Sequence, residues 1–461
     1  MDVEMKLETD EEMERRKLVL KQVEYIFLQF VRTVAVEVLH LPEDEAHAAG
    51  GKLYISGSHK LGVREPKADI DTVCVAPNFC TREHFFTILK EEFMGHASVT
   101  EFNAVETALV PLMSFDFDGV SIDLLFARMA DNVVPENLDI LDDSILTGLD
   151  DATEKSLNGP RVTMMIGELV GANFQTFLIV LRCVRRWAKR KGLYGNKLGY
   201  LGGVNCNILV AFVCQLYPAA SPSTLLTRFF QVYASWQWPK PVMLNKIQQN
   251  PPNMVGKDRI VWSAEIYPHH LMPILTPAYP SMNSTEKVTR HTLAIMQQEF
   301  AQSHAVIKSI ISERGKDFRI DWDRLFEPSD FFLRYTHYLG CHIIGAGPDA
   351  ESRSWIGFAE SRVLGFSRFL EFLPLRHPLH FYPVVSRTDK SPNSVCYFIG
   401  FDIDMKAFEG KSDKNIYIDE CVHKFQYVIV LLLLLLISTF QSLFSTYIFY
   451  TFKSPLCIFL A

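Results

Sequence analysis

The first part of the chain alternates between helical and strand-like hydrophobic patterns. Apolar positions recur with a helical period over residues 11–38, and again in HFFTILKEEF, residues 84–93. Short apolar runs bounded by polar residues predict four strands, at 52–56, 70–75, 109–117 and 120–126. Helices interleaved with strands favour an α/β domain. We place this domain at residues 1–140, with an N-terminal helix.

The second part is mostly helical. From residue 173 to about 301, apolar positions recur with a helical period, interrupted by Pro-rich breaks at 238–241 and 272–280. The polar stretch that precedes it, PENLDILDDSILTGLDDATEKSLNG, separates it from the α/β domain. We therefore predict a helical middle domain at residues 141–304.

The third part mixes both patterns. It opens with two helix-like segments, DFFLRYTHYLGCHII and SWIGFAESRVLGFSRFLEF, and continues with two strand-like ones, LHFYPVV and SVCYFIGFDI. This combination predicts a small α+β domain at residues 305–425, whose strand pattern is complete by Ile403.

An apolar tail follows at residues 426–461. No charged residue occurs between 425 and 452, and residues 431–436 are all leucine. Such a length would span a bilayer, so a membrane segment is one interpretation. The other is a segment derived from an alternative exon or a translated intron. Under both, the tail is expected to be dispensable for catalysis.

Three aspartates in the α/β domain are the main candidates for chemistry. Asp69 and Asp71 project to the same face of one predicted strand, because side chains alternate along a strand. Asp123 stands alone in a second apolar strand, where an unpaired carboxylate is costly unless it faces a cation or donors. Converging carboxylates suit Mg²⁺, and two such ions can clamp the oxygens of a phosphoryl displacement. A lone D-x-D pair is commonly a surface turn, but this context favours a nucleotidyltransferase palm.

Glycine and serine just upstream fit a phosphate. Gly57 permits close backbone approach and Ser58 supplies a hydroxyl. Further along, Arg185 and Lys189 lie one turn apart on a predicted helix and can contact one ligand. Tyr194, which can stack on a base, follows within a few residues. Together these residues predict a nucleotide clamp that faces the aspartates.

Length, net charge and cysteine content limit the number of domains, the kind of nucleic-acid surface and the redox environment that the protein can have. The chain has 461 residues, too many for one core, and a net charge of −7, so any nucleic-acid surface must be local. Its nine cysteines show no zinc-ligand spacing and are expected to be reduced thiols of an intracellular protein. The charged N-terminus carries no secretory signal pattern.

A series of phrases resembles the eukaryotic poly(A) polymerases of the main nuclear type. They are SGSHKLGV, ADIDTVCVAP, DGVSIDLLFAR, SLNGPRV, RRWAKRKGLYGN, LGYLGGVN, CQLYP, WQWPKPV and HLMPILTPAYPSMNST, in family order. Other nucleotidyltransferases share only the Gly-Ser and D-x-D elements. The resemblance covers roughly residues 10–400.

The resemblance implies a template-independent enzyme that adds AMP from ATP to RNA 3′ ends, as in mRNA polyadenylation. Its catalytic residues would be Asp69, Asp71 and Asp123, which would also hold two Mg²⁺ or Mn²⁺ ions. The residues implied to bind ATP are Ser56, Gly57, Ser58, Asp123, Asn158, Arg185, Lys189, Tyr194, Gly203 and Val204. Asn196 would contact the RNA, and the third domain would be an RRM-like RNA-binding domain. The family also implies the nucleus and 3′-end processing factors as partners, with membrane association only through the tail.

The chain departs from the family pattern at several places. Ser56 replaces an aromatic residue, Arg185 replaces a lysine, and the turn before Asp69 reads Arg64-Glu65-Pro66-Lys67 where Gly or Ser is usual. An RNA-binding pseudo-polymerase with weak or no activity and a terminal uridylyltransferase therefore remain alternative hypotheses.

Overall fold

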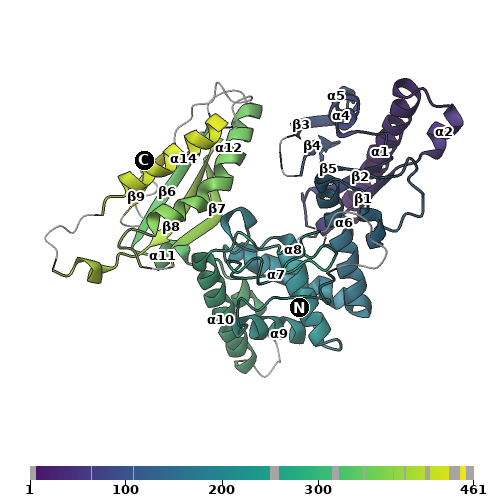
Figure 1. Ribbon diagram of the computed structural model, residues 1–461. Coiled ribbons are helices and arrows are strands. Elements are labelled where there is room, and N and C mark those ends of the chain that lie inside the picture. Colours follow the sequence, from purple (N-terminus) through teal and green to yellow (C-terminus); the bar gives the residue numbers. More distant parts are fainter. Residues whose placement is uncertain are drawn as a thin grey trace.

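Figure 1 shows the computed structural model of the chain. The structure describes residues 7–63, 65–106, 108, 110–249, 259–313, 321–345, 349–376, 378–388, 391–410, 416–435 and 447–452. Three regions follow one another along the chain: a sheet with helices (purple to blue), a group of helices (teal) and a second sheet with helices (green to yellow).

The first sheet, as far as the described residues show it, has five strands in the order β1-β2-β5-β4-β3. β2 and β5 run parallel, and the other neighbouring pairs are antiparallel. The strands are β1 (Lys52–Ile55), β2 (Ile70–Ala76), β3 (Val99–Val105), β4 (Leu112–Phe117) and β5 (Val120–Arg128). All four strands expected from the sequence are present, and β3 is an edge strand that the pattern did not indicate.

The long N-terminal helix α1 (Asp10–Thr33) covers this sheet. Thr9 and Glu12 form a capping box that satisfies free backbone N–H groups at its start. Apolar residues at helical spacing, among them Val23, Phe27 and Phe30, are fully buried in one cluster with the strands. A π-helical turn (Val34–Val38) continues the helix, so the expected helix at 11–38 is confirmed.

Shorter helices complete this region. They are α2 (Glu43–Ala48), α3 (Gly57–Leu61), α4 (Arg82–His84) and α5 (Lys90–Gly95), with a π-helical turn (Phe85–Leu89) between the last two. The helix expected at 84–93 is therefore confirmed, although it begins slightly earlier.

The middle region is helical, as expected. Its helices are α6 (Asp151–Val170), α7 (Phe174–Arg190), α8 (Gly203–Leu216), α9 (Pro222–Ala234) and α10 (Arg290–Ser312). Trp187 of α7 is completely buried, stacks on Phe300 and donates a hydrogen bond of 2.7 Å to the Ser303 hydroxyl of α10. Together α6 and α7 are long and apolar enough to cross a membrane, but buried helices of soluble proteins pass the same test of length and composition.

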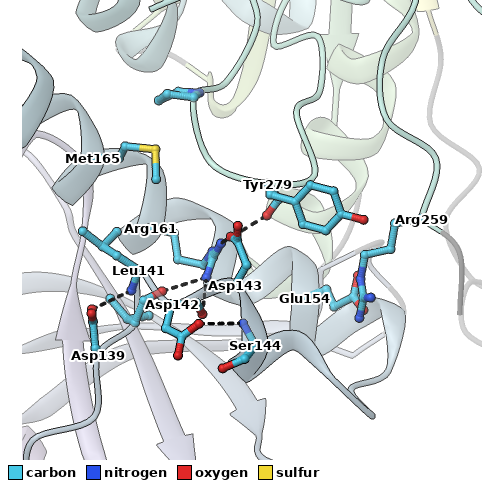
Figure 2. A network of polar contacts seen from close by, with 12 residues as sticks. Asp139, Leu141, Asp142, Asp143, Ser144, Glu154, Arg161, Met165, Arg259 and Tyr279 are labelled. Atoms are coloured by element: carbon cyan, nitrogen blue, oxygen red, sulfur yellow. Dashed lines mark hydrogen bonds and ion pairs between the residues drawn. The ribbon is translucent and has the colours of Figure 1, made fainter. Parts of the chain in front are cut away.

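A buried arginine ties the first region to the second (Figure 2). Arg161 of α6 donates hydrogen bonds to the carbonyls of Ile140 at 2.8 Å and Asp142 at 3.2 Å, in the segment that leaves β5. It also forms an ion pair of 2.5 Å with Asp143 and reaches the Tyr279 carbonyl at 3.3 Å. These contacts fix the connection between the palm sheet and α6 against the segment before α10.

The third region has a second sheet in the order β7-β8-β6-β9. Its strands and helices follow as α11 (Phe331–Arg334), β6 (His337–Ile344), α12 (Asp349–Val363), α13 (Ser367–Leu370), β7 (His380–Thr388), β8 (Ser391–Phe401), α14 (Asp419–Leu435) and β9 (Tyr447–Phe452). Omitting the two short helices, this is a β-α-β-β-α-β order in which every strand pair is antiparallel.

Two sequence predictions in this region are wrong. The first is the helix expected in DFFLRYTHYLGCHII, where the chain forms the single turn α11 and then the buried strand β6. A short apolar run bounded by turns has no period that separates a buried strand from a helix.

The second wrong prediction is that the strand pattern ends by Ile403. β9, within the apolar tail, pairs antiparallel with β6, with Tyr338 in register with Phe452 and Ile343 in register with Tyr447. The boundary expected at residue 425 falls inside α14, whose Phe425 is buried and lies 5.0 Å from the Phe366 ring, centroid to centroid. Residues 436–446 and 453–461 of the tail lie outside the described residues.

Candidate functional site

The parallel pair of strands brings two of the aspartates together. In the register of β2 and β5, Asp71 is directly opposite Asp123. In-register residues on neighbouring strands project to the same face, and Asp69, two positions before Asp71, belongs to that face as well. Thr72 points to the other side and donates a hydrogen bond of 3.0 Å to the Asp123 carbonyl, which holds the two strands in this register.

The carboxylates repel one another. Burial, followed by repulsion from Asp123 and Asp69, raises the pKa of Asp71 to about 6, against a lowering by Arg185. The pKa of Asp69 is also raised, first by burial and then by repulsion from Asp123 and Asp116, while the nearby Arg16 charge acts in the opposite direction. Carboxylates whose pKa is raised by burial and by a neighbouring acid form an electronegative oxygen site of the kind a divalent cation neutralises.

The donor set fits such an ion in composition, but its geometry is open. In the part of the chain that the structure describes, no three His, Cys, Asp or Glu side chains are gathered closely enough to hold a metal as they stand. One oxygen of Asp123 accepts a hydrogen bond from the Ser114 hydroxyl of β4. Closing the three carboxylates around an ion therefore requires side-chain rotation.

Gly57 lies directly against the acids. Its φ is +65°, a conformation that favours glycine, and a Cβ there would lie 2.1 Å from Asp71 Oδ2. Its N–H donates a hydrogen bond of 3.1 Å to the Thr163 hydroxyl of α6, while the Ser56 N–H donates to the Asp71 carbonyl at 2.9 Å. Ser56 is buried, and Ser58 is half-buried in the first turn of α3.

The basic residues of the expected clamp lie on α7. Arg185 is buried and donates a hydrogen bond of 3.3 Å to Asn207 Oδ1 on α8. Lys189, one turn later, is exposed, with its Nζ 5.1 Å from the centre of the Tyr194 ring. Burial raises the pKa of Tyr194 to about 12, with Arg185 acting in the opposite direction. The structure therefore brings Arg185, Lys189 and Tyr194 together as expected.

The start of α8 completes this clamp. A Cβ on Gly203 would lie 2.8 Å from Arg185 Nη2, so a larger residue there would shift the guanidinium, and it would lie 3.4 Å from the Tyr194 hydroxyl, an ordinary contact distance. Val204 is half-buried beside it. Since the charge of Arg185 acts on Asp71, the clamp and the palm carboxylates belong to one electrostatic site.

The two asparagines lie at the margins of this site. Asn158 is half-buried on α6, next to Gly159, where a Cβ would lie 3.4 Å from the Ser56 hydroxyl. Asn196 is exposed, and its Cβ would lie 3.6 Å from a Cβ placed on Gly202. Both are near the elements expected to bind the nucleotide.

Two further arginines of α7, Arg182 and Arg186, contact other parts of the fold. Arg182 donates hydrogen bonds to the carbonyls of Val63 at 2.9 Å and Gly62 at 2.7 Å, holding the end of α3. The Arg186 guanidinium lies 5.5 Å from the centre of the Phe326 ring. Basic composition alone does not distinguish these residues from Arg185 and Lys189.

Four supporting residues were not identified from the sequence. Ser114 holds Asp123, Thr163 holds Gly57, Asn207 holds Arg185, and Asn205 accepts a hydrogen bond of 2.6 Å from the Gly202 N–H. Each is a small polar residue in an otherwise ordinary strand or helix, so no local pattern marks it. The cysteines that the structure describes are free thiols, as expected.

Comparison with known proteins identifies the family. The poly(A) polymerase nucleotidyltransferase domain matches residues 1–170, and the poly(A) polymerase central domain matches residues 176–328. Nuclear poly(A) polymerase 1 of Arabidopsis thaliana is 41% identical over 401 residues, which are 85% of this chain and 54% of that protein. Poly(A) polymerase of Dictyostelium discoideum is 37% identical over 432 residues, 92% of this chain and 51% of that protein.

The chain spans about half the length of the curated relatives it matches. A solved structure of the Cid1 poly(U) polymerase with MgGTP bound is 15% identical, covers 70% of this chain and 95% of its own, and has a TM-score of 0.49. That likeness carries no argument about activity. The two family models and the curated relatives show that this chain has the nucleotidyltransferase fold and belongs to the poly(A) polymerase family.

Proposed function

We propose that the protein is a polynucleotide adenylyltransferase that adds AMP units from ATP to RNA 3′ ends, as in mRNA polyadenylation. The observation that carries the proposal is the register of β2 and β5, which pairs Asp71 with Asp123. The charge of Arg185 acts on Asp71, and Lys189 and Tyr194 lie together in the clamp. The curated relatives named poly(A) polymerase support adenine as the base.

The proposed reaction is in-line attack of an RNA 3′-hydroxyl on the α-phosphorus of ATP, with pyrophosphate leaving. Asp69, Asp71 and Asp123 would hold Mg²⁺ or Mn²⁺. When bound, these ions would lower the pKa of the 3′-hydroxyl and neutralise negative charge on the leaving oxygens. No protein nucleophile takes part, so no covalent intermediate forms.

The remaining site residues bind and orient the nucleotide. Arg185 and Lys189 present a buried guanidinium and an exposed ammonium to the triphosphate. The Tyr194 ring would stack on the base, with Val204 and Asn158 shaping the same pocket. Gly57 and Ser58 would approach the phosphates beside Asp71, next to the buried Ser56, and Asn196 would contact the RNA end.

We further propose a three-domain organisation in which the third domain binds RNA. Its β-α-β-β-α-β order and antiparallel sheet support an RRM-like domain. RRM domains bind single-stranded RNA on the surface of a four-stranded sheet. Two relatives are named nuclear poly(A) polymerases, which supports the nucleus as the location. We propose 3′-end processing factors as partners from the family resemblance of the sequence.

Nucleotide choice is the test of this function. The full chain is incubated with Mg²⁺, a labelled single-stranded RNA and each nucleoside triphosphate in turn, and the products are sized. We expect long extension with ATP and little with the others. Preferred extension with UTP would instead indicate a terminal uridylyltransferase, and RNA binding without extension would indicate a pseudo-polymerase.

A further inference from the structure

A glutamate occupies the cationic part of the clamp. Glu65 lies in the loop between α3 and β2, in the turn where the chain departs from the family pattern. Its Oε2 is 3.0 Å from Lys189 Nζ and 3.6 Å from Arg185 Nη1. One carboxylate therefore binds both of the basic groups that we assign to the triphosphate.

We propose that Glu65 is an internal competitor for the triphosphate, which lowers the affinity of the protein for nucleotide. This inference rests on the proposed function, because it concerns the same basic groups. A carboxylate and a phosphate oxygen are alternative acceptors for a guanidinium or an ammonium, so both cannot occupy the same donors at once. The nucleotide must displace Glu65 before its phosphates reach Arg185 and Lys189.

The surroundings of Glu65 allow this exchange. The Glu65 carbonyl accepts a hydrogen bond of 3.3 Å from the Ala68 N–H, and the Ala68 carbonyl accepts one of 2.6 Å from Arg16. These contacts anchor the loop backbone while the Glu65 side chain, which is 25% exposed, has room to turn toward solvent. Arg185 is only 4% exposed, so Glu65 offsets its charge in the free protein, and the phosphates take the place of Glu65 when the nucleotide binds.

The competitor is expected to be weak. Lys189 is 48% exposed, and ion pairs open to water contribute little, so removing the Glu65 charge should tighten triphosphate binding about fivefold. A ligand without phosphates should not respond, because it does not need these two cations. A structural defect in the variant would weaken the binding of both kinds of ligand. Measuring both therefore distinguishes competition by Glu65 from damage to the fold.

The test compares the full-length protein with its Glu65→Gln variant. Equilibrium binding of magnesium tripolyphosphate and of adenosine is measured at constant ionic strength. Glu43→Gln is the matched control, because it makes the same change in net charge at an ion pair of 3.2 Å with Arg32 in the first region. We expect tighter tripolyphosphate binding and unchanged adenosine binding for Glu65→Gln alone, and a lower KM for ATP.

Several results would overturn the proposal. Tripolyphosphate affinity that is unchanged or weaker in Glu65→Gln would show that Glu65 does not compete, and a gain shared by Glu43→Gln would reduce the effect to net charge. Glu65→Asp, whose shorter side chain keeps the charge, should give a smaller gain and provides a second variant. If Glu65→Gln responds as expected but the wild type adds no AMP to RNA, only the proposed function fails.

Discussion

Gly57 and Asp71 cannot both keep their positions once the glycine gains a side chain. We expect Gly57→Ala to abolish most RNA extension, because the new Cβ would lie 2.1 Å from Asp71 Oδ2 and would displace that carboxylate. Gly62→Ala is the matched control, since Gly62 has φ +72° and nothing within 4 Å of the same Cβ position. Both variants carry the backbone strain of about 1–2 kcal/mol.

Melting temperature and extension rate, measured for both variants, separate strain from displacement. Similar melting temperatures with a much lower rate in Gly57→Ala would support the assigned contact. Equal rates in the two variants would show that Asp71 moves freely or is not needed.

At this scale the sequence predicts the residues that carry formal charge or lack a side chain. Asp71 and Asp123 could be singled out because burying a carboxylate in an apolar strand is costly unless a cation or hydrogen-bond donors compensate its charge. Ser114 and Asn207 could not, because a small polar residue has a hydrogen-bond role only once its partner is placed across the sheet or the helix pair. Glu65 was visible as a departure, but its contact with Arg185 depends on the loop conformation.

Among the elements, the connection between β5 and α6 depends on one buried side chain. Arg161 is only 1% exposed and bonds three carbonyls and Asp143, so we expect Arg161→Leu to lower the free energy of unfolding by about 3–5 kcal/mol. Arg82→Leu is the control, because the Arg82–Asp150 pair is partly exposed and should contribute about 1 kcal/mol or less.

Chemical denaturation followed by tryptophan fluorescence gives both values. Equal losses for the two variants would contradict the assigned role of Arg161, because a surface arginine would then be worth as much as the buried one.

Element type was predictable where a period was long and failed where it was short. The period of α1 extends over more than six turns, and α1 was correctly predicted. β6 is a mostly buried strand of eight residues that follows the helical turn α11 closely. The apolar residues of the two elements together resemble the pattern of one helix. The strand β3 was missed because its residues are mostly half-buried or exposed at the sheet edge.

For the molecule as a whole, the apolar tail is the segment whose role changes most. The sequence predicts that residues 426–461 are dispensable for catalysis and that the strand pattern is complete by Ile403, whereas β9 forms a fourth strand beside β6. We expect deletion of residues 426–461 to speed hydrogen exchange at the β6 amides that face β9. Deletion of residues 453–461 should leave that exchange unchanged. Exchange of β6 that is equal in both truncations would restore the view that the tail is separate.

The pairing of β9 could not be predicted, because it joins residues separated by more than a hundred positions and the tail has no alternation of polar and apolar residues. Domain order was easier, since the change from strand-like to helical periods marks the middle region directly. One buried cluster joins the middle region to the second sheet and contains, for example, Trp187 of α7 and Ile399 of β8. This contact became evident only in the structure.

The most direct test of the account is the rate of a single AMP addition by Asp123→Asn with saturating MgATP. We expect a rate about a thousandfold or more below that of the wild type, because one ligand of the divalent ions is lost while the side-chain shape is kept. Asp116→Asn, on the neighbouring strand but outside the assigned ligand set, should lose far less. An unreduced rate in Asp123→Asn, with an unchanged melting temperature, would contradict the assignment of the palm aspartates as the catalytic centre.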